Sequence, residues 1–207
     1  MKTKALILDL DNTIFPVEAI ADDVFGPLYK RIEQDGSFNG DLAELRNDMM
    51  RLPLQKVAKS YGFSSSLRED CNTLLKNMSY DKPIRAFKDY AEIQNLPYRK
   101  YLVTMGYKKL QHSKIRQLGI EKDFEEVIII DPEQSDKEKK DIFKEIADKH
   151  GFKPEEIVVI GDDPDSEIAG AKELGMEAIL YDKINRHSDI PKNRITDYKE
   201  LADYFTD

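Results

Sequence analysis

Residues 4–16 read KALILDLDNTIFP, and this stretch decides the fold. A run of apolar residues leads directly into two aspartates, Asp9 and Asp11, which are separated only by Leu10. Like charges this close repel each other, and each loses hydration when it is buried, so the pair needs either open water or a cation. The stretch therefore predicts a buried strand whose carboxyl end carries a charged site.

Four further short apolar runs resemble this first one in their β-branched character. They are YLVTM (101–105), EVIIID (126–131), EIVVIGD (156–162) and EAILYD (177–182). Nearly continuous apolar strands are typical of a sheet covered on both faces, and helix-like segments separate the last four runs, as in parallel βαβ units. We therefore expect an α/β fold with a Rossmann-like, parallel, five-stranded sheet.

The segment between the first and second strands has a different pattern. Residues 17–81 contain no convincing strand, and four stretches have the apolar spacing of short amphipathic helices: IADDVFGPLYKRI, LAELRNDMM, LQKVAKSYGF and LREDCNTLLKNM. A crossover between parallel strands needs only about a dozen residues, so this segment is predicted to be an inserted all-helical cap. The predicted core then comprises residues 1–16 and 82–207.

The composition limits the partners of the protein. It has 40 acidic and 32 basic side chains, a formal net charge of −8, which disfavours general binding to a phosphate backbone. No stretch approaches the ~20 apolar residues of a membrane span. The single cysteine, Cys71, cannot form an internal disulfide, which fits a reducing compartment. We expect a cytoplasmic protein without nucleic-acid or membrane partners, and the sequence carries no signal of oligomeric state.

Polar residues gather where the predicted strands end. Asp9 and Asp11 follow the first strand, Thr104 ends the second, and GDDPDSE (161–167) follows the fourth. Ligands of open parallel sheets bind at the carboxyl ends of the strands, so these side chains are expected to meet at one edge. Several carboxylates around one hydroxyl favour a hard divalent cation with oxygen ligands, and Mg²⁺ is the usual intracellular choice.

These residues, in this order, resemble the motifs of the haloacid dehalogenase-like hydrolase superfamily. DLDNTI (9–14) resembles the first motif, LVTMG (102–106) the second and GDDPDSEIAGAKELGM (161–176) the fourth, and ITDYKELADYF (195–205) resembles the closing helix of the family. The third motif matches least, because the family commonly has Lys-Pro-x-Pro before a helix and this chain has DKEKKDIF (136–143). Lys137 has the family's spacing to Phe143, and Lys139 and Lys140 remain alternatives.

The resemblance implies unequal roles for the first two aspartates. Asp9 would attack phosphorus and form an aspartyl-phosphate, which divides one difficult displacement into two easier ones. Asp11 would protonate the leaving alcohol and then take a proton from the hydrolytic water. Asp11 would also offer its backbone carbonyl to the metal.

The resemblance also implies the remaining site residues. Thr104, Met105 and Lys137 would bind the transferred phosphate, with the lysine offsetting charge in the transition state. Asp9, Asp11, Asp162 and Glu167 would form the metal site, and Asp163 is a further candidate.

The acid at position 11 separates the branches of the family. The haloalkanoate dehalogenases and the phosphonate-cleaving branch lack it, so hydrolysis of a phosphate ester is favoured. We therefore expect an Mg²⁺-dependent phosphatase that acts on a small-molecule phosphate monoester, such as a nucleotidase or a sugar-phosphate phosphatase. The alternatives are a phosphotransferase such as a phosphomutase, and a non-catalytic phosphate-binding regulatory protein similar to a receiver domain. The cap carries no motif that identifies the ester.

Overall fold

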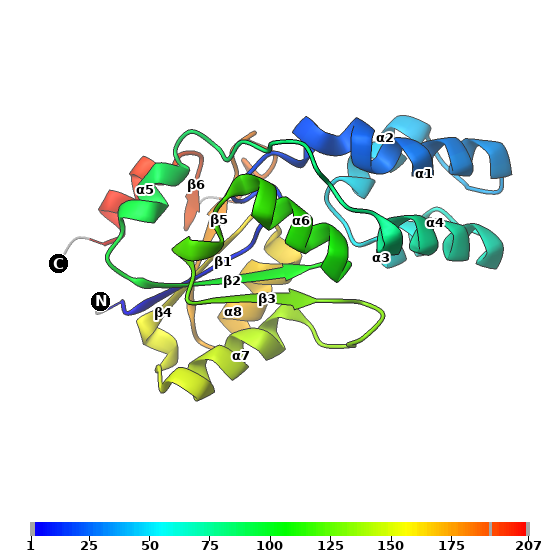
Figure 1. Cartoon of the computed structure of the whole chain (residues 1–207). Helices are drawn as coiled ribbons and strands as arrows, with labels where there is room; N and C mark the ends of the chain where they lie inside the picture. The colour runs from blue at the N-terminus through cyan, green and yellow to red at the C-terminus, as the bar shows by residue number, and fades with distance from the viewer. Residues whose placement is uncertain (1–2, 191, 206–207) are drawn as a thin grey trace.

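A parallel six-stranded sheet forms the centre of the part of the molecule that the structure describes (Figure 1). The structure is a computed structural model that describes residues 3–190 and 192–205. The strands lie in the order β3-β2-β1-β4-β5-β6. Their bounds are β1 (Ala5–Leu8), β2 (Arg99–Met105), β3 (Glu126–Ile130), β4 (Ile157–Gly161), β5 (Glu177–Tyr181) and β6 (Arg194–Ile195). The predicted α/β class and the five predicted strands are confirmed.

The strand order places the first strand at the centre of the sheet. The chain builds β2 and β3 on one side of β1 and then crosses to β4 on the other side, so the switch in direction falls at β1. The crevice at such a switch point is where open α/β sheets bind ligands. The sixth strand was not predicted, because its two residues are too few to show a periodic pattern.

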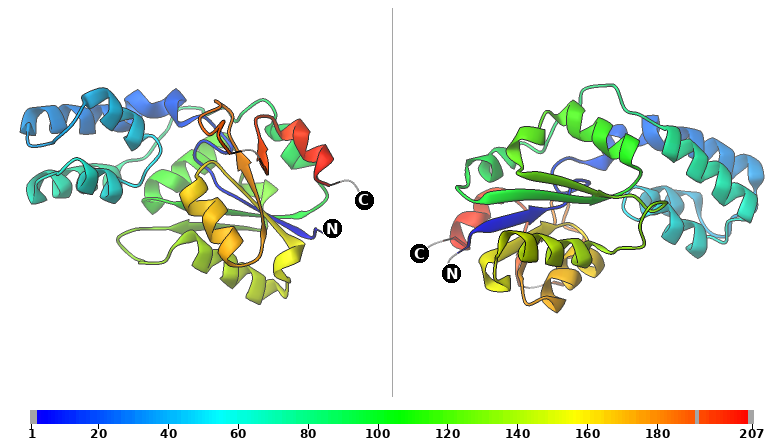
Figure 2. Two further views of the ribbon diagram at one scale, coloured as in Figure 1. Left: turned by 180° about the vertical axis from the view of Figure 1, so that it is seen from behind. Right: turned by 60° about the horizontal axis from the view of Figure 1, so that its bottom comes forward.

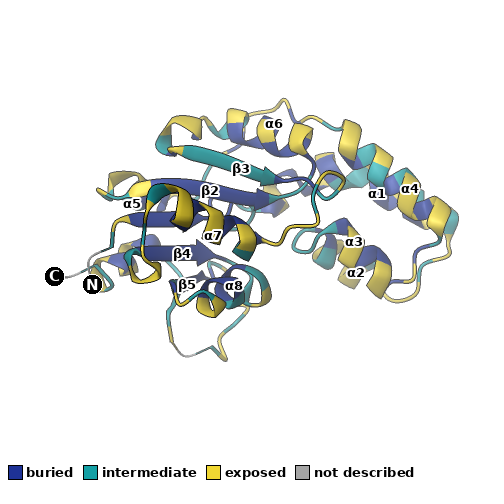
Figure 3. Ribbon diagram, turned by 90° about the horizontal axis from the view of Figure 1, so that it is seen from below, coloured by how far each residue is buried: buried dark blue, intermediate teal, exposed yellow. Residues whose placement is uncertain are grey.

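Helices cover both faces of the sheet. On one face α7 (Lys139–His150) and α8 (Ala169–Glu173) bury their apolar side chains against β1, β2 and β4. On the other face lie α5 (Tyr90–Asn95) and α6 (Lys108–Leu118) (Figure 1). Figure 3 shows that β1, β2 and β4 are mostly buried, that the edge strand β3 is of intermediate burial, and that the helices carry their exposed residues on their outer surfaces.

Four helices of residues 17–81 extend from one end of the sheet (Figure 2). After a short 3₁₀ turn, Val17–Ile20, they are α1 (Ala21–Asp35), α2 (Leu42–Met49), α3 (Leu54–Ser60) and α4 (Ser65–Asn77). Capping side chains fix two of their starts, because the Asp41 carboxylate and the Ser64 hydroxyl accept amide hydrogen bonds at the first turns of α2 and α4. The division of the chain into a core and a cap stays a prediction.

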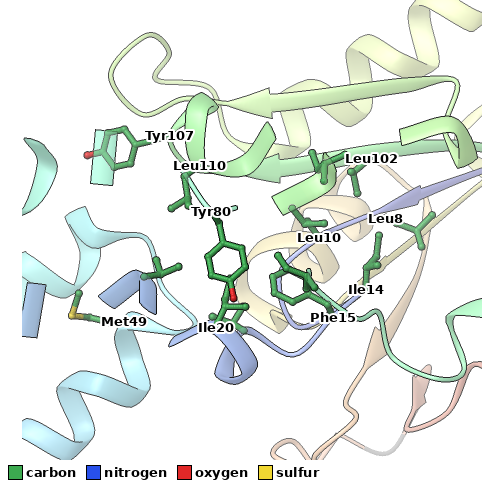
Figure 4. Close-up of a cluster of buried hydrophobic side chains, with 14 of the residues drawn as sticks. Leu8, Leu10, Ile14, Phe15, Ile20, Met49, Tyr80, Leu102, Tyr107 and Leu110 are labelled. Atoms are coloured by element: carbon green, nitrogen blue, oxygen red, sulfur yellow. The ribbon is translucent and has the colours of Figure 1, made fainter. Parts of the chain in front are cut away.

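One apolar cluster continues from the sheet into these helices. Leu8 and Leu102 belong to β1 and β2, Leu10 and Phe15 follow β1, and Met49 ends α2 (Figure 4). Burial of apolar area contributes roughly 25 cal/mol per Å². Packing across the junction therefore fixes the helices of residues 17–81 over the carboxyl edge of the sheet.

The segment after β5 supports the turn that follows β1. The predicted closing helix is instead a 3₁₀ turn, Tyr198–Asp203, directly after β6. The Tyr198 hydroxyl donates to the Thr13 carbonyl at 2.7 Å, and the Tyr198 ring stacks on Tyr181 with centroids 4.0 Å apart. Both tyrosines also donate to the buried Asp89 carboxylate, Tyr181 through its hydroxyl and Tyr198 through its amide.

In the described residues, no helix combines the length and the apolar character needed to cross a membrane.

Candidate active site

A cavity of about 510 Å³ lies between the carboxyl edge of the sheet and the helices of residues 17–81. Its volume is within the ~300–1,000 Å³ of small-molecule sites. The residues predicted for the site all line it: Asp9, Asp11, Thr104, Met105, Lys137, Asp162, Asp163 and Glu167. The side-chain contacts within this set then show which residues act together.

Asp9 is buried at the centre of the site. Its amide donates to the Ile160 carbonyl at 3.1 Å, which continues the pairing of β1 with β4 by one residue. Lys139 Nζ lies 2.5 Å from Asp9 Oδ1. Burial raises the pKa of Asp9 to about 7; Lys139 opposes this change, whereas Glu167 and Asp11 add to it. The carboxylate is therefore crowded by other acids and is balanced only in part by one lysine.

The lysine that contacts Asp9 is Lys139, which the sequence analysis kept as an alternative to Lys137. Lys137 is exposed, and its ammonium pairs with Glu145 at 2.5 Å. Lys140 pairs with Glu173 at 2.8 Å, away from Asp9. The helix explains the difference, because α7 begins at Lys139, and Lys137 precedes its first turn.

The sequence contained a signal for Lys139. Lys139, Ile142, Phe143 and Ile146 are spaced as one face of a helix, and all four are buried. A lysine within an apolar stripe is expected to find an acidic partner, since its charge would otherwise be desolvated without compensation. The helical period of this segment was therefore a better guide than the spacing to a single aromatic residue.

Glu167 holds Lys139 from the side opposite Asp9. The Lys139 ammonium donates to Glu167 Oε1, and the Asp163 amide donates to Oε2 at 3.3 Å. Burial alone would lower the pKa of Lys139, but the two carboxylates raise it above its usual value. A Cβ added at Gly161 would lie 2.6 Å from the Glu167 side chain, so this close packing needs glycine there. Glu167 serves the lysine in this geometry, and its role as a metal ligand stays a prediction.

Asp11 has a lysine of its own, which the sequence analysis missed. Lys114 Nζ lies 2.8 and 2.9 Å from the two carboxylate oxygens of Asp11, and the lysine side chain is 5% exposed. Gln111 Nε2 donates to Asp11 Oδ2 at 2.9 Å and to Thr104 Oγ1 at 2.7 Å. Lys114 and Gln111 thus hold Asp11 and the predicted phosphate-binding threonine in one hydrogen-bonded group.

The spacing of α6 could have revealed Gln111 and Lys114. Both lie in the buried stripe of the helix with Leu110 and Ile115, where polar residues are unexpected unless they have partners.

Gly106 lets the helix approach the site. Its φ is +152°, and a Cβ there would lie 3.1 Å from the Gln111 side chain. A larger residue at 106 would therefore push Gln111 away from Thr104.

The turn after Asp11 connects the core to the helices of residues 17–81. Asn12 has a φ of +59°, a left-handed conformation that asparagine tolerates better than most residues. Its amide oxygen accepts from the Val17 amide at 3.2 Å, and its Nδ2 donates to the Met50 carbonyl at 3.1 Å. The turn that places Asp11 thus also holds the loop between α2 and α3.

Asp162 gives the site the acidic character that a divalent cation would need. Burial raises its pKa well above the usual value, and the neighbouring carboxylates of Asp9 and Glu167 raise it further. In the described residues, no group of three or more acidic, histidine or cysteine side chains is arranged to hold a metal. Mg²⁺ commonly binds through only one or two protein carboxylates, with waters and substrate phosphate as its other ligands. Asp9 and Asp162, with the Asp11 carbonyl, fit that donor set.

The comparison with protein families is decisive. Residues 3–175 match the model of the haloacid dehalogenase-like hydrolases. The chain belongs to this haloacid dehalogenase-like hydrolase family. The predicted resemblance is therefore confirmed, and Asp9, Asp11, Thr104, Lys139 and Asp162 all lie within the matched region of the hydrolase.

Individual relatives of the hydrolase cover nearly the whole chain. Glyceraldehyde 3-phosphate phosphatase of Methanopyrus kandleri is 27% identical over 97% of this chain and 96% of its own length. Enolase-phosphatase E1 of Persephonella marina is 27% identical over 91% of each chain. Among solved structures, the putative hydrolase YfnB of Bacillus subtilis, which is described as bound to magnesium, covers 100% of both chains with a TM-score of 0.67 and 18% identity. This last likeness supports the fold.

Proposed function

We propose that this hydrolase is a magnesium-dependent phosphatase that cleaves a small phosphate monoester through an aspartyl-phosphate on Asp9. The observation that carries the proposal is the pairing of the two aspartates with separate lysines in one cavity. Lys139 binds Asp9, and Lys114 binds Asp11. The names of the relatives, which are phosphatases of small phosphate esters, support the same reaction.

The first step transfers the phosphoryl group to the enzyme. A carboxylate oxygen of Asp9 forms a bond to phosphorus while the bond from phosphorus to the ester oxygen breaks, and Asp11 gives that oxygen its proton. Lys139 offsets negative charge that moves onto the phosphoryl oxygens, since its raised pKa keeps it cationic. Thr104, held by Gln111, orients one of those oxygens.

The second step returns the enzyme to its starting state. Asp11, now ionised, takes a proton from a water molecule as the water oxygen attacks phosphorus. The bond between Asp9 and phosphorus breaks, inorganic phosphate leaves, and Asp11 again holds the proton. Mg²⁺ held by Asp9, Asp162 and the Asp11 carbonyl would supply positive charge to the phosphoryl group in both steps. The surrounding helices limit the entry of other water molecules.

The proposed activity is tested with a panel of small phosphate monoesters, including glyceraldehyde 3-phosphate, a nucleoside monophosphate and a hexose phosphate. We expect phosphate release with Mg²⁺, a fall of at least tenfold after treatment with EDTA and dialysis, and recovery when Mg²⁺ is returned. The reason is that Asp9 and Asp162 line the same cavity, where a cation would balance their carboxylates and the phosphoryl group of the substrate. Full turnover in the metal-free protein would contradict the metal requirement, and no release from any ester would contradict the phosphatase.

Lys114→Met should slow the reaction by roughly tenfold for an alkyl phosphate and by much less for p-nitrophenyl phosphate, a smaller loss than that of the general acid itself because Asp11 remains. Lys114 orients Asp11, and a poor leaving group depends on Asp11 more than a good one does. Lys114→Arg should restore part of the rate. Lys108→Met on the same helix is the control, because Lys108 is exposed and contacts Gln134. Equal losses with both esters would indicate a merely structural role for Lys114.

A further inference from the structure

The cavity is lined by different chemistry on its two sides. The core side carries Asp9, Asp11 and Asp162, whereas the cap side is mainly apolar and includes Phe25 and Met49. Arg51 also lines the cavity from the loop between α2 and α3, among these apolar neighbours. Gln55 and Lys56 of α3 also line this wall, but Arg51 is the lining arginine, and the hydrolytic steps at Asp9 do not use it.

The position of Arg51 is fixed next to the catalytic turn. The carbonyl of Met50, the preceding residue, accepts a hydrogen bond from Asn12 Nδ2 at 3.1 Å. Asn12 directly follows Asp11. The backbone of the arginine is therefore held close to the acid that protonates the leaving group, on the side of the cavity where the rest of the substrate would extend.

The Arg51 side chain has an unmet hydrogen-bonding requirement. Its Nε is buried and has no hydrogen-bond partner in the described part of the chain. A buried donor without an acceptor is unfavourable, and most such groups in proteins are paired. Because arginine remains charged and presents its donors in a planar fork, the acceptor that fits best is a carboxylate or a phosphate.

A second arginine, Arg186, carries positive charge near Arg51, but it is exposed and does not line the cavity. Partial burial lowers the pKa of Arg186, and the nearby Arg51 guanidinium lowers it further, while Asp162 opposes the change. The two guanidinium groups are thus close enough to repel each other. Asp182 and Glu18 also oppose the change, so the need for an anion rests on the buried donor of Arg51.

We propose that Arg51 binds a second anionic group on the leaving-group portion of the substrate, so that the enzyme prefers phosphate monoesters that also carry a carboxylate or another phosphate. This inference rests on the proposed phosphatase activity and specifies its substrate class. The transferred phosphate is served by Lys139 and Thr104 on the core side, whereas Arg51 reaches the cavity from the opposite wall. Its apolar neighbours suit a compact carbon skeleton between the two charged ends.

The test compares esters that differ only in the second group. The first set tests a carboxylate: 3-phosphoglycerate is compared with glyceraldehyde 3-phosphate and glycerol 3-phosphate, which lack it. The second set tests a second phosphate: propane-1,3-diyl bisphosphate is compared with 3-hydroxypropyl phosphate. We expect the wild type to have a higher kcat/KM for the member of each set with the second anion. Arg51→Gln should lower that kcat/KM at least tenfold. It should change the kcat/KM of the esters without a second anionic group less than twofold. The two sets distinguish a carboxylate from a phosphate.

Two variants serve as controls. Arg51→Lys keeps the charge and should retain part of the preference. Lys59→Gln removes a charge from the same region and should leave all rates unchanged, because Lys59 is exposed and lies outside the residues that line the cavity. A wild-type preference for glyceraldehyde 3-phosphate over 3-phosphoglycerate would overturn the inference. So would an equal loss of kcat/KM in Arg51→Gln on esters with and without the second anionic group.

Binding measurements separate this inference from the phosphatase itself. Calorimetry with Asp9→Asn measures the affinity for 3-phosphoglycerate and for glycerol 3-phosphate without turnover. Tighter binding of 3-phosphoglycerate that is lost in the Asp9→Asn/Arg51→Gln double variant supports the role of Arg51 even if the wild type hydrolyses neither ester. Equal binding of both esters contradicts that role even if hydrolysis is observed.

Discussion

Asp9→Asn is expected to abolish both turnover and any covalent phosphate on the protein. The amide has no anionic oxygen with which to attack phosphorus, and no second carboxylate in the described site has the same contact with Lys139 and the same place at the end of β1. The expected loss is roughly 10⁴-fold or more, which is comparable with the loss of a nucleophile in other enzymes that use covalent catalysis.

Asp11→Asn should fail in a different way, because the nucleophile is still present. With p-nitrophenyl phosphate the first step needs little proton donation, so phosphoryl-enzyme should accumulate while its hydrolysis stalls. With an alkyl phosphate even the first step should slow, because the departing alkoxide needs a proton. Turnover of both esters should fall, on the order of 10²–10⁴-fold for the alkyl ester.

Rapid quenching with a labelled substrate distinguishes these two variants. The covalent species should be stable in acid and labile to hydroxylamine, as an acyl phosphate is. Labelled phosphate on Asp9→Asn would contradict the assignment of the nucleophile. An Asp11→Asn enzyme that cleaves both esters at the wild-type rate would contradict the assignment of the acid.

Lys139→Ala should lower kcat by roughly 10²–10³-fold, the range for loss of one preorganised donor to a developing charge. The lysine lies between Asp9 and Glu167 and is 9% exposed, so its charge acts in a site from which most water is excluded. Lys137→Ala is the matched control. Lys137 lies two residues away and is half exposed, and its ion pair with Glu145 is on the surface. Steady-state rates of the two variants with one ester decide the comparison.

Stability must be separated from catalysis in this experiment. Removing Lys139 leaves two buried carboxylates without a cation, which can cost roughly 3–5 kcal/mol of folding free energy. The double variant Lys139→Met/Glu167→Gln removes one of these charges, so it should unfold at a higher temperature than Lys139→Met and still turn over slowly. A double variant with nearly wild-type kcat would show that Lys139 has no role beyond folding.

Much of the fold could be predicted from the sequence. The apolar runs at 5–10, 101–105 and 156–162 are continuous because both faces of the sheet are buried, and this pattern is visible without a structure. The ends of those strands also located Asp9, Thr104 and Asp162, since parallel strands bring their carboxyl ends to one edge. The helical insertion was visible from the change in apolar period.

The unpredicted parts depend on contacts between distant residues. β6 has two residues, and its pairing with β5 is tertiary information. Lys114 contacts Asp11 across 103 residues of sequence, so no local motif joins them. The choice of Lys137 rested on its spacing to one aromatic residue, whereas Lys139 lies on the buried face of the helix. Arg51 could not be identified because the loop between α2 and α3 has no recognisable motif.

The contact of Tyr198 with Thr13 has a consequence for how the enzyme matures. The two residues are separated by 185 positions, yet the hydroxyl of one holds the carbonyl of the other in the loop between Asp11 and Phe15. Contacts between residues so distant in sequence form late, because the intervening chain must first be ordered. During synthesis, the catalytic loop therefore stays without this support until residue 198 has left the ribosome and docked. We expect the hydrolase to gain full activity only at that late stage, so a chain that is still being synthesised should not yet cleave phosphate esters.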